Sequence, residues 1–421
     1  MPPEASRRSF LKLAGGVALA PAVVSSLGNS SSVWASVPAA GEDYWEMVRR
    51  QFSFPENRVP MNAANLCPSP RAVADQVAEL TRDIDADCSF QNRAKFQKLL
   101  ETSRQKVAQH LGVSADEIAL VRNTSEANNT VNNGLALKPG DEVVLWDQNH
   151  PTNNVAWDVR AARFGLRVRR VQTPATPADA SQLLRVFEDA FGSRTRVLAL
   201  TYVSNVSGVR LPVRELCESA HRRGIHVHVD GAQTWGALNV NLRELGCDSY
   251  SASAHKWFVG PKEVGLLYIR QDRIADVWPN VVAPGWGSKV EPQVRGARKF
   301  ESLGQRDDAA LAAVATAVDF HLAIVPARVE ARVYELANAL KGGLKEAGAE
   351  LVTPMDPALS AGVCVIRVPA GKGEQVYQKL YAEHGIAGAS TGGLRLCPHV
   401  YNTREHVERA VRGVKALLPR S

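Results

Sequence analysis

Apolar and polar residues follow two different periods along the central part of the chain. Short, nearly continuous apolar runs recur between longer stretches in which apolar side chains return every three or four positions. The first pattern predicts buried strands, and the second predicts amphipathic helices. Strands and helices in regular succession are typical of a mostly parallel sheet with helices on both faces. The expected strands are Glu117–Val121, Glu142–Trp146, Leu166–Val171, Val197–Val203, Ile225–Asp230 and Val264–Ile269, and the expected helices between them are Ser125–Leu137, Val155–Phe164 and Val213–Arg223.

The regions on either side of this alternation predict further units. Asp43–Phe54 has helical periodicity and should end at Pro55, whereas Arg93–Leu111 should end at Gly112. Residues 279–299 are rich in Gly, Pro and Trp, which predicts an irregular segment. A long helix over Asp307–Ile324 leads into a final α+β segment. We expect a signal at residues 1–40, an N-terminal arm at 41–60, a large domain at 61–300 and a small C-terminal domain at 301–421.

The first 40 residues have the pattern of an export signal. The pair Arg7-Arg8 precedes an apolar run over Leu11–Leu27, and small residues follow as far as Ala40. This order is typical of a bacterial twin-arginine signal peptide, with cleavage expected between residues 35 and 40. A membrane anchor is the alternative, but the run is short and is interrupted by Pro21. We therefore expect a periplasmic protein with no stable membrane anchor after cleavage.

Composition narrows the class of protein further. The chain has 421 residues, 45% of them hydrophobic, and a net charge of +7 that is spread along its length. Nucleic-acid binding would need a basic stripe and a recognisable module, and neither is present. The six cysteines form no CxxC pair, which argues against a zinc site, and we expect most of them to be buried free thiols.

One lysine is distinguished by its position. Lys256 lies in a small-residue turn between a Ser/Ala-rich stretch and the strand predicted over Val264–Ile269. Open α/β sheets place their chemistry at such strand-end turns. A lysine desolvated there can lose its proton and attack a carbonyl carbon to form a Schiff base. Asp230 ends another predicted strand and is placed to pair with a cationic ring nitrogen, so the two residues together predict one site.

The strand that ends at Asp230 also carries two histidines. Because side chains alternate along a strand, His226, His228 and Asp230 should point to the same face. An HxH pair can belong to a metal site, but no further ligand cluster accompanies this one. We favour packed, hydrogen-bonded histidines and predict no metal.

Several motifs, in a fixed order, resemble one family. They are NTSEAN at 123–128, QNHPTN at 148–153, VSNVSG at 203–208, VHVDGAQ at 227–233, SASAHK at 251–256, and Arg395 shortly before Tyr401-Asn402-Thr403. Together they resemble the class V aminotransferase group of pyridoxal phosphate enzymes, which includes cysteine desulfurases and isopenicillin N epimerases. The resemblance implies a type I fold, with a mostly parallel seven-stranded sheet in a large domain and a smaller C-terminal α+β domain. It also implies a homodimer.

The resemblance assigns roles to the residues of these motifs. Lys256 would form the Schiff base with pyridoxal 5'-phosphate, Asp230 would keep the pyridine nitrogen protonated, and His150 would stack on the ring. Thr124 and Ser125 would bind the phosphate at a helix N-terminus, where backbone amides favour anions. Further cofactor contacts are expected from Asn205, Gln233, Ser253 and His255, and from Gln305 across a dimer interface. Arg395 would hold a substrate carboxylate, and a structural salt bridge is the alternative for this residue.

The departures from the family pattern narrow the expected reaction. Cysteine desulfurases carry a nucleophilic cysteine shortly before the carboxylate-binding arginine, but residues 384–393 contain none. Persulfide chemistry is therefore disfavoured, and the chain most resembles the isopenicillin N epimerase-like branch. The export signal favours tailoring of a peptide or siderophore precursor. An aminotransferase or a C–S or other lyase acting on a free amino acid is an alternative, as is a non-catalytic periplasmic binding protein.

Overall fold

The computed structural model describes residues 41–283, 295–369 and 371–418. The predicted export signal at residues 1–40 lies outside this range. The Pro284–Gly287 part of the predicted irregular segment also lies outside it.

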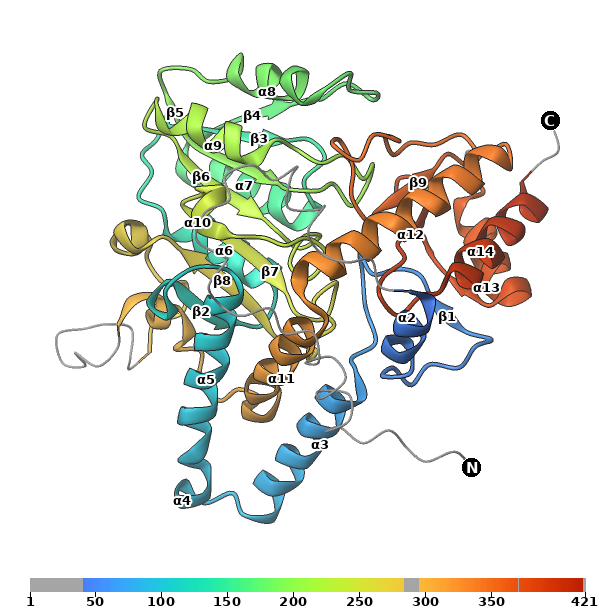
Figure 1. Ribbon diagram of the computed structural model, residues 1–421. Coiled ribbons are helices and arrows are strands. Elements are labelled where there is room, and N and C mark those ends of the chain that lie inside the picture. The colour runs from blue at the N-terminus through green and yellow to red at the C-terminus, as the bar shows by residue number, and fades with distance from the viewer. Residues whose placement is uncertain (1–40, 284–294, 370, 419–421) are drawn as a thin grey trace.

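A mostly parallel seven-stranded sheet forms the centre of the molecule (Figure 1). The strand order is β2-β8-β7-β6-β5-β3-β4, and only β8 runs against its neighbours within this sheet. This arrangement confirms the fold class expected from the alternating pattern. The strands are β2 (Ile118–Val121), β3 (Glu142–Trp146), β4 (Arg167–Val171), β5 (Thr195–Thr201), β6 (His226–Asp230), β7 (Ser249–Ser253) and β8 (Gly265–Ile269).

Helices cover both faces of this sheet because its strands are buried on both sides. In β3, Val144 and Trp146 pack into the largest hydrophobic cluster, whereas Val143 and Leu145 pack into a separate one. The helices of the large domain are α3 (Arg71–Ala86), α4 (Phe90–Arg93), α5 (Lys95–His110), α6 (Thr124–Gly134), α7 (Pro151–Phe164), α8 (Ala180–Glu188), α9 (Val213–His221) and α10 (Leu242–Leu245). Helices α6 and α7 lie side by side, and α6 also packs against β6, β7 and β8.

Two of the helix boundaries that differ from the prediction have a clear local cause. The helix expected over Val155–Phe164 begins at Pro151, because His150 caps it and proline is favoured at a first helical position. The helix expected over Asp43–Phe54 is α2 (Glu42–Arg49). It ends early because the Arg49 guanidinium donates to the carbonyl oxygens of Phe52 and Phe54, which holds the chain in a turn.

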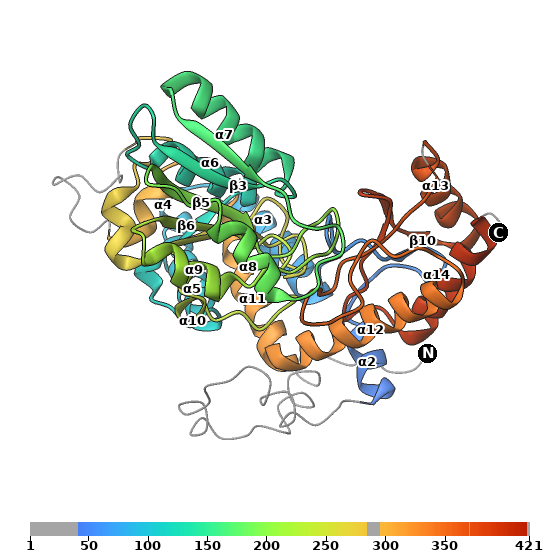
Figure 2. The ribbon, with the colours of Figure 1, turned by 90° about the horizontal axis from the view of Figure 1, so that it is seen from above.

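The C-terminal part forms a smaller α+β layer (Figure 2). A three-stranded sheet of β11 (Ala389–Ser390), β12 (Leu394–Leu396) and β9 (Cys364–Ile366) lies beside a two-stranded pair of β1 (Val59–Pro60) and β10 (Ile386–Ala387). The N-terminal arm therefore joins the C-terminal part through strand pairing. The helices are α11 (Asp308–Ile324), α12 (Pro326–Glu346), α13 (Gly373–His384) and α14 (Arg404–Leu417), of which α11 packs against α5 and α3.

Two further features concern the membrane and the cysteines. Within the described ranges, no single helix is long and apolar enough to cross a membrane, and α11 and α12 pass that test only as a pair bent by 75°. All six cysteines are free thiols, and only Cys88 is exposed. Cys397, expected inside a strand, directly follows β12.

Candidate active site

Lys256 lies in a turn after β7, at the edge of the sheet where the parallel strands end. The turn is closed by a hydrogen bond of 2.9 Å from the Val259 amide to the Lys256 carbonyl oxygen. Val259 has a φ of 48°, a left-handed conformation that β-branched residues avoid, so packing holds this turn in an unfavourable backbone shape. The turn therefore fixes where the Lys256 side chain begins.

The Lys256 amine is in an environment that favours its neutral, nucleophilic form. Burial lowers its pKa from the usual range, the charge of Asp230 partly opposes this shift, and the charge of Arg395 adds to it. Within the described part of the chain, Nζ makes no hydrogen bond. Lys256 is half-buried, and an amine that lacks an acceptor is available for bond formation.

Asp230 is the last residue of β6 and is 1% exposed. Its Oδ1 accepts a hydrogen bond of 3.0 Å from the Ala232 amide, and its Oδ2 accepts one of 2.9 Å from Asn128 Nδ2. Gly231 follows because a Cβ atom at that position would overlap the ring of Tyr250. The donors to its two oxygens fix the orientation of the carboxylate, which can pair with a protonated ring nitrogen.

The predicted phosphate turn is built from two elements. Ser253 Oγ, at the end of β7, accepts a hydrogen bond of 2.8 Å from the Thr124 amide and lies 2.7 Å from Thr124 Oγ1. Ser125 Oγ lies at the same helix end and donates to Thr152 Oγ1 at 3.4 Å. The N-cap Asn123 accepts from the Glu126 amide. Hydroxyl groups therefore gather at the positive end of the α6 dipole, an arrangement suited to an anion.

His150 begins α7 beside this turn. Its Nδ1 lies 2.8 Å from Thr152 Oγ1, which fixes one edge of the ring. Burial lowers its pKa, and the nearby charges of Lys256 and Arg395 lower it further, whereas Asp230 opposes the shift. Because the charges of Lys256, Asp230 and Arg395 all act on His150, these four side chains lie close together.

Arg395 and Asn205 meet directly. Arg395, in β12, donates from Nη1 to the Asn205 carbonyl oxygen at 3.0 Å and from Nη2 to Asn62 Oδ1 at 3.0 Å. Its Nε and the Asn205 Oδ1 are buried without a hydrogen-bond partner in the described structure. Buried polar atoms left unpaired are costly, so these two atoms are candidates for contact with a bound molecule.

Gln233 and His255 have different surroundings. Both ends of the Gln233 amide are engaged, because Nε2 donates to the Ala64 carbonyl oxygen at 3.1 Å and Oε1 accepts from Trp257 Nε1 at 2.8 Å. Gln233 thus ties the loop after β6 to the turn of Lys256. Burial and the charge of Lys256 lower the pKa of His255 to about 4, so its ring is neutral near pH 7.

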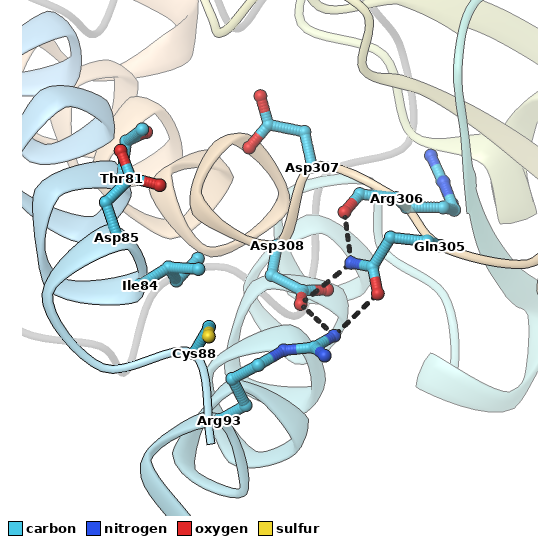
Figure 3. A pocket seen from close by; sticks show the side chains of 9 residues that line it. All are labelled: Thr81, Ile84, Asp85, Cys88, Arg93, Gln305, Arg306, Asp307 and Asp308. Atoms are coloured by element: carbon cyan, nitrogen blue, oxygen red, sulfur yellow. Dashed lines mark hydrogen bonds and ion pairs between the residues drawn. The ribbon is translucent and has the colours of Figure 1, made fainter. Parts of the chain in front are cut away.

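Gln305, unlike the other predicted site residues, makes its contacts outside the site around Lys256. It is exposed and lines a surface pocket of about 360 Å³, where its Oε1 accepts a hydrogen bond of 2.7 Å from Arg93 Nη2 (Figure 3). Its Nε2 faces Asp308 at 3.5 Å. Its role across a dimer interface stays a prediction.

Three asparagines in and near the motifs were not assigned a role from the sequence. Asn128 bonds to Asp230, Asn62 bonds to Arg395, and Asn149 holds the loop before α7 by accepting from the Thr201 amide at 2.7 Å. Asn128 follows Thr124 by one helical turn, so helical spacing could have placed it on the same face. No local pattern marks Asn62, because its partner is 333 residues away.

The two strand histidines have ordinary hydrogen-bond partners. His228 Nδ1 lies 2.8 Å from Ser249 Oγ, and His226 Nε2 lies 3.2 Å from the same oxygen. Among the described residues, no group of three or more His, Cys, Asp or Glu side chains is placed to hold a metal ion.

The segment before Arg395 is ordered as short strands. Residues 386–396 contain β10, β11 and β12, and Ala389 pairs with Arg395 across the turn. Two of the buried cysteines near this region are Cys397 and Cys67, and burial raises the pKa of Cys397 and raises that of Cys67 to about 12. Neither thiol is therefore activated as a thiolate.

The residues present fit pyridoxal phosphate. Lys256 supplies an amine for the aldehyde, Asp230 supplies an anion for the pyridine nitrogen, and hydroxyl groups at the α6 N-terminus suit the phosphate. The unpaired Asn205 Oδ1 and Arg395 Nε leave polar atoms for a ligand. When bound, this cofactor supplies an electron sink for a carbanion at a substrate α-carbon.

Comparison with known proteins shows which family the chain is similar to. The model of the aminotransferase class-V family matches residues 63–413. The chain is 31% identical to the isopenicillin N epimerase of Amycolatopsis lactamdurans and 29% identical to that of Streptomyces clavuligerus, over 89% of this chain and 98% of each relative. It is 26% identical to a probable cysteine desulfurase of Vibrio cholerae, over 85% of this chain and 92% of the relative.

Solved structures share the fold. A mutant of C-DES with glycine covalently linked to its PLP cofactor superposes with a TM-score of 0.80 at 24% identity, covering 88% of this chain and 99% of that one. The apo cysteine desulfurase of Thermococcus onnurineus gives 0.79 at 25% identity, covering 89% and 98%. The chain therefore belongs to the class V aminotransferase family and is a pyridoxal phosphate-dependent enzyme of fold type I.

Proposed function

We propose that the protein acts at the α-carbon of an amino-acid or peptide substrate, as in the isopenicillin N epimerase-like branch, and not as a cysteine desulfurase. The observation that carries this proposal is the segment before Arg395, which forms short strands and contains no cysteine. The match to two isopenicillin N epimerases over 89% of the chain supports it.

Each residue of the site has a role in this proposal. Lys256 would hold the cofactor, and its amine would move the proton at the α-carbon of the substrate. Asp230 holds the ring nitrogen in its protonated form, and His150 packs against the ring. Arg395 holds the substrate carboxylate through a planar, bidentate contact that lysine could not match. Thr124, Ser125, Ser253 and His255 would hold the phosphate, and Asn205 and Gln233 would lie near the ring oxygen.

The cellular setting is part of the same proposal. Residues 1–40 direct export by the twin-arginine route, which carries folded proteins and so suits an enzyme that receives its cofactor first. The substrate would then be a periplasmic amino acid or a peptide such as a siderophore precursor. Two chains would form a homodimer in which Gln305 approaches the neighbouring phosphate.

The direct test is a substrate screen with purified holoenzyme. Amino acids and short peptides would be incubated in D₂O and analysed by mass spectrometry and chiral chromatography. The proposal predicts deuterium at an α-carbon, with inversion of configuration and no change in the substrate's other atoms. Keto-acid formation would instead favour an aminotransferase, and release of a side-chain fragment would favour a lyase. Visible absorbance without reaction of any compound would favour a binding protein.

Export and assembly need separate measurements. Replacing Arg7 and Arg8 by lysine should retain the protein in the cytoplasmic fraction, and equal periplasmic levels would contradict export by this route. Sedimentation of the mature chain should give the mass of a dimer. A monomer would contradict the role of Gln305.

A further inference from the structure

A chain of buried polar side chains runs along β6 to the carboxylate of Asp230. His226 and His228 both approach Ser249 Oγ, at 3.2 Å and 2.8 Å. His228 Nε2 then lies 2.9 Å from Asn128 Oδ1, and Asn128 Nδ2 lies 2.9 Å from Asp230 Oδ2. These side chains come from β6, β7 and α6, and all except His226 are less than 2% exposed.

The direction of each hydrogen bond in this series of side chains can be deduced by starting from Asp230. The Asp230 carboxylate only accepts, so the nitrogen of the Asn128 amide must face it. The Asn128 oxygen therefore faces His228 and must accept from a protonated Nε2. His228 is neutral, because burial lowers its pKa to about 3, and its unprotonated Nδ1 must then accept from the Ser249 hydroxyl.

The hydrogen-bond directions of Ser249 and His226 are determined in the same way. Ser249 Oγ gives its only hydrogen to His228, so it must accept from His226 Nε2. Ser251 Oγ also donates to Asn128 Oδ1, at 2.5 Å, and this second donor prevents the Asn128 amide from turning over. All the donors along the chain thus point toward Asp230.

We propose that His228 is a positioning residue of the cofactor site, which acts through Asn128 to hold the Asp230 carboxylate in its hydrogen-bonded orientation. This proposal rests on the proposed role of Asp230 at the ring nitrogen. Without the His228 donor, the Asn128 oxygen loses one of its two donors and keeps only Ser251 Oγ. The amide is then held less firmly, which weakens its hydrogen bond to the Asp230 carboxylate and with it the contact between Asp230 and a protonated ring nitrogen.

The test compares two replacements of His228 with a matched control. His228→Leu removes the donor, whereas His228→Gln keeps an amide N–H near the position of Nε2. His406→Leu is the control, because His406 is similarly buried at 3% but lies in α14 and bonds to Glu56. Each protein would be loaded with ¹⁵N-labelled pyridoxal phosphate, and its cofactor affinity and ring ¹⁵N signal would be measured.

The expected results separate a positioning role from a merely structural one. His228→Leu should weaken cofactor binding roughly three- to tenfold, the range for one hydrogen bond between neutral groups, and move the ring ¹⁵N signal toward the unprotonated value. His228→Gln should restore both, and His406→Leu should change neither. An unchanged ¹⁵N signal and affinity in His228→Leu would overturn the proposal, as would a glutamine variant no better than leucine.

A milder variant covers the case in which His228→Leu does not fold. Ser249→Ala removes only the hydroxyl that sets the His228 tautomer, so it should weaken cofactor binding roughly two- to tenfold and shift the ring signal partly. Wild-type affinity and signal in Ser249→Ala would then overturn the proposal. If the wild-type protein fails to bind the cofactor, this result contradicts the enzyme assignment itself and not the role proposed for His228.

Discussion

Two interior lysines of this protein differ in what surrounds their ammonium groups. Lys341, in α12, is fully buried, and its Nζ lies 2.9 Å from Ser360 Oγ, 3.2 Å from the Pro354 carbonyl oxygen and 3.4 Å from that of Met355. Lys256, in the turn after β7, makes no hydrogen bond from Nζ to any described residue. Burial lowers the pKa of both groups.

The difference shows that a lowered pKa does not by itself identify a catalytic lysine. Lys341 satisfies three acceptors and so joins a loop to a helix. Lys256 instead faces a carboxylate, an arginine and a histidine that influence its charge without bonding to it. A buried amine that is left without acceptors is available for a reaction, whereas one that is surrounded by acceptors stabilises the fold.

Removing the amine of Lys256 should abolish activity, whereas removing that of Lys341 should lower stability. This contrast is the largest effect that we expect. Lys256→Ala should abolish the visible absorbance of the lysine-bound cofactor and all turnover, while the unfolding midpoint changes little. Lys341→Met should keep the absorbance but lose about 1–3 kcal/mol of stability, because buried acceptors are left unpaired. Absorbance spectra and urea titrations measure both. Loss of the absorbance in Lys341→Met would reverse the assignment.

The two buried aspartates of the sheet offer a similar contrast. Asp230→Asn should lower turnover roughly a hundredfold or more, since it removes the charge that faces the ring nitrogen. Asp248→Asn should instead destabilise the fold by about 3–5 kcal/mol, because Asp248 Oδ1 is bonded to Arg270 and Arg273. Kinetics and denaturation of the two variants check this. Equal stability losses with unchanged turnover would contradict the role of Asp230.

The pH dependence of cofactor capture should reflect the lowered pKa of Lys256. Only the neutral amine attacks an aldehyde, so capture is fast above the pKa of that amine and falls about tenfold per pH unit below it. The fall should therefore begin at a lower pH for the apoenzyme than for free N-acetyl-lysine, whose amine has the ordinary lysine pKa. Stopped-flow absorbance gives both profiles, and coincident profiles would show that the site does not activate Lys256.

The phosphate turn should give the smallest effect. Thr124→Val removes one hydroxyl at the start of α6 and should weaken cofactor binding roughly three- to tenfold. Thr130→Val is the control on the same helix, because Thr130 Oγ1 donates to the Glu126 carbonyl oxygen. Fluorescence titration of the apoproteins compares them. If the two variants bind the cofactor equally well, Thr124 does not contact the phosphate.

The sequence predicted the large domain well because its strands are short apolar runs that end in polar residues. The strand at Glu142–Trp146 has the predicted bounds, and the structure places Lys256 and Asp230 at neighbouring strand ends. The small domain was predicted only in outline, since its strands of two or three residues carry no visible period. Contacts such as Asn62 to Arg395 depend on the packing of distant segments, which no local pattern encodes.

The most direct test of the central claim is to identify the lysine that holds the cofactor. The holoenzyme would be reduced with borohydride, digested, and mapped by mass spectrometry for peptides that carry a phosphopyridoxyl group. We expect one modified peptide that contains Lys256, with Lys341 and Lys262 unmodified. A modification on another lysine, or an unmodified protein, would contradict it.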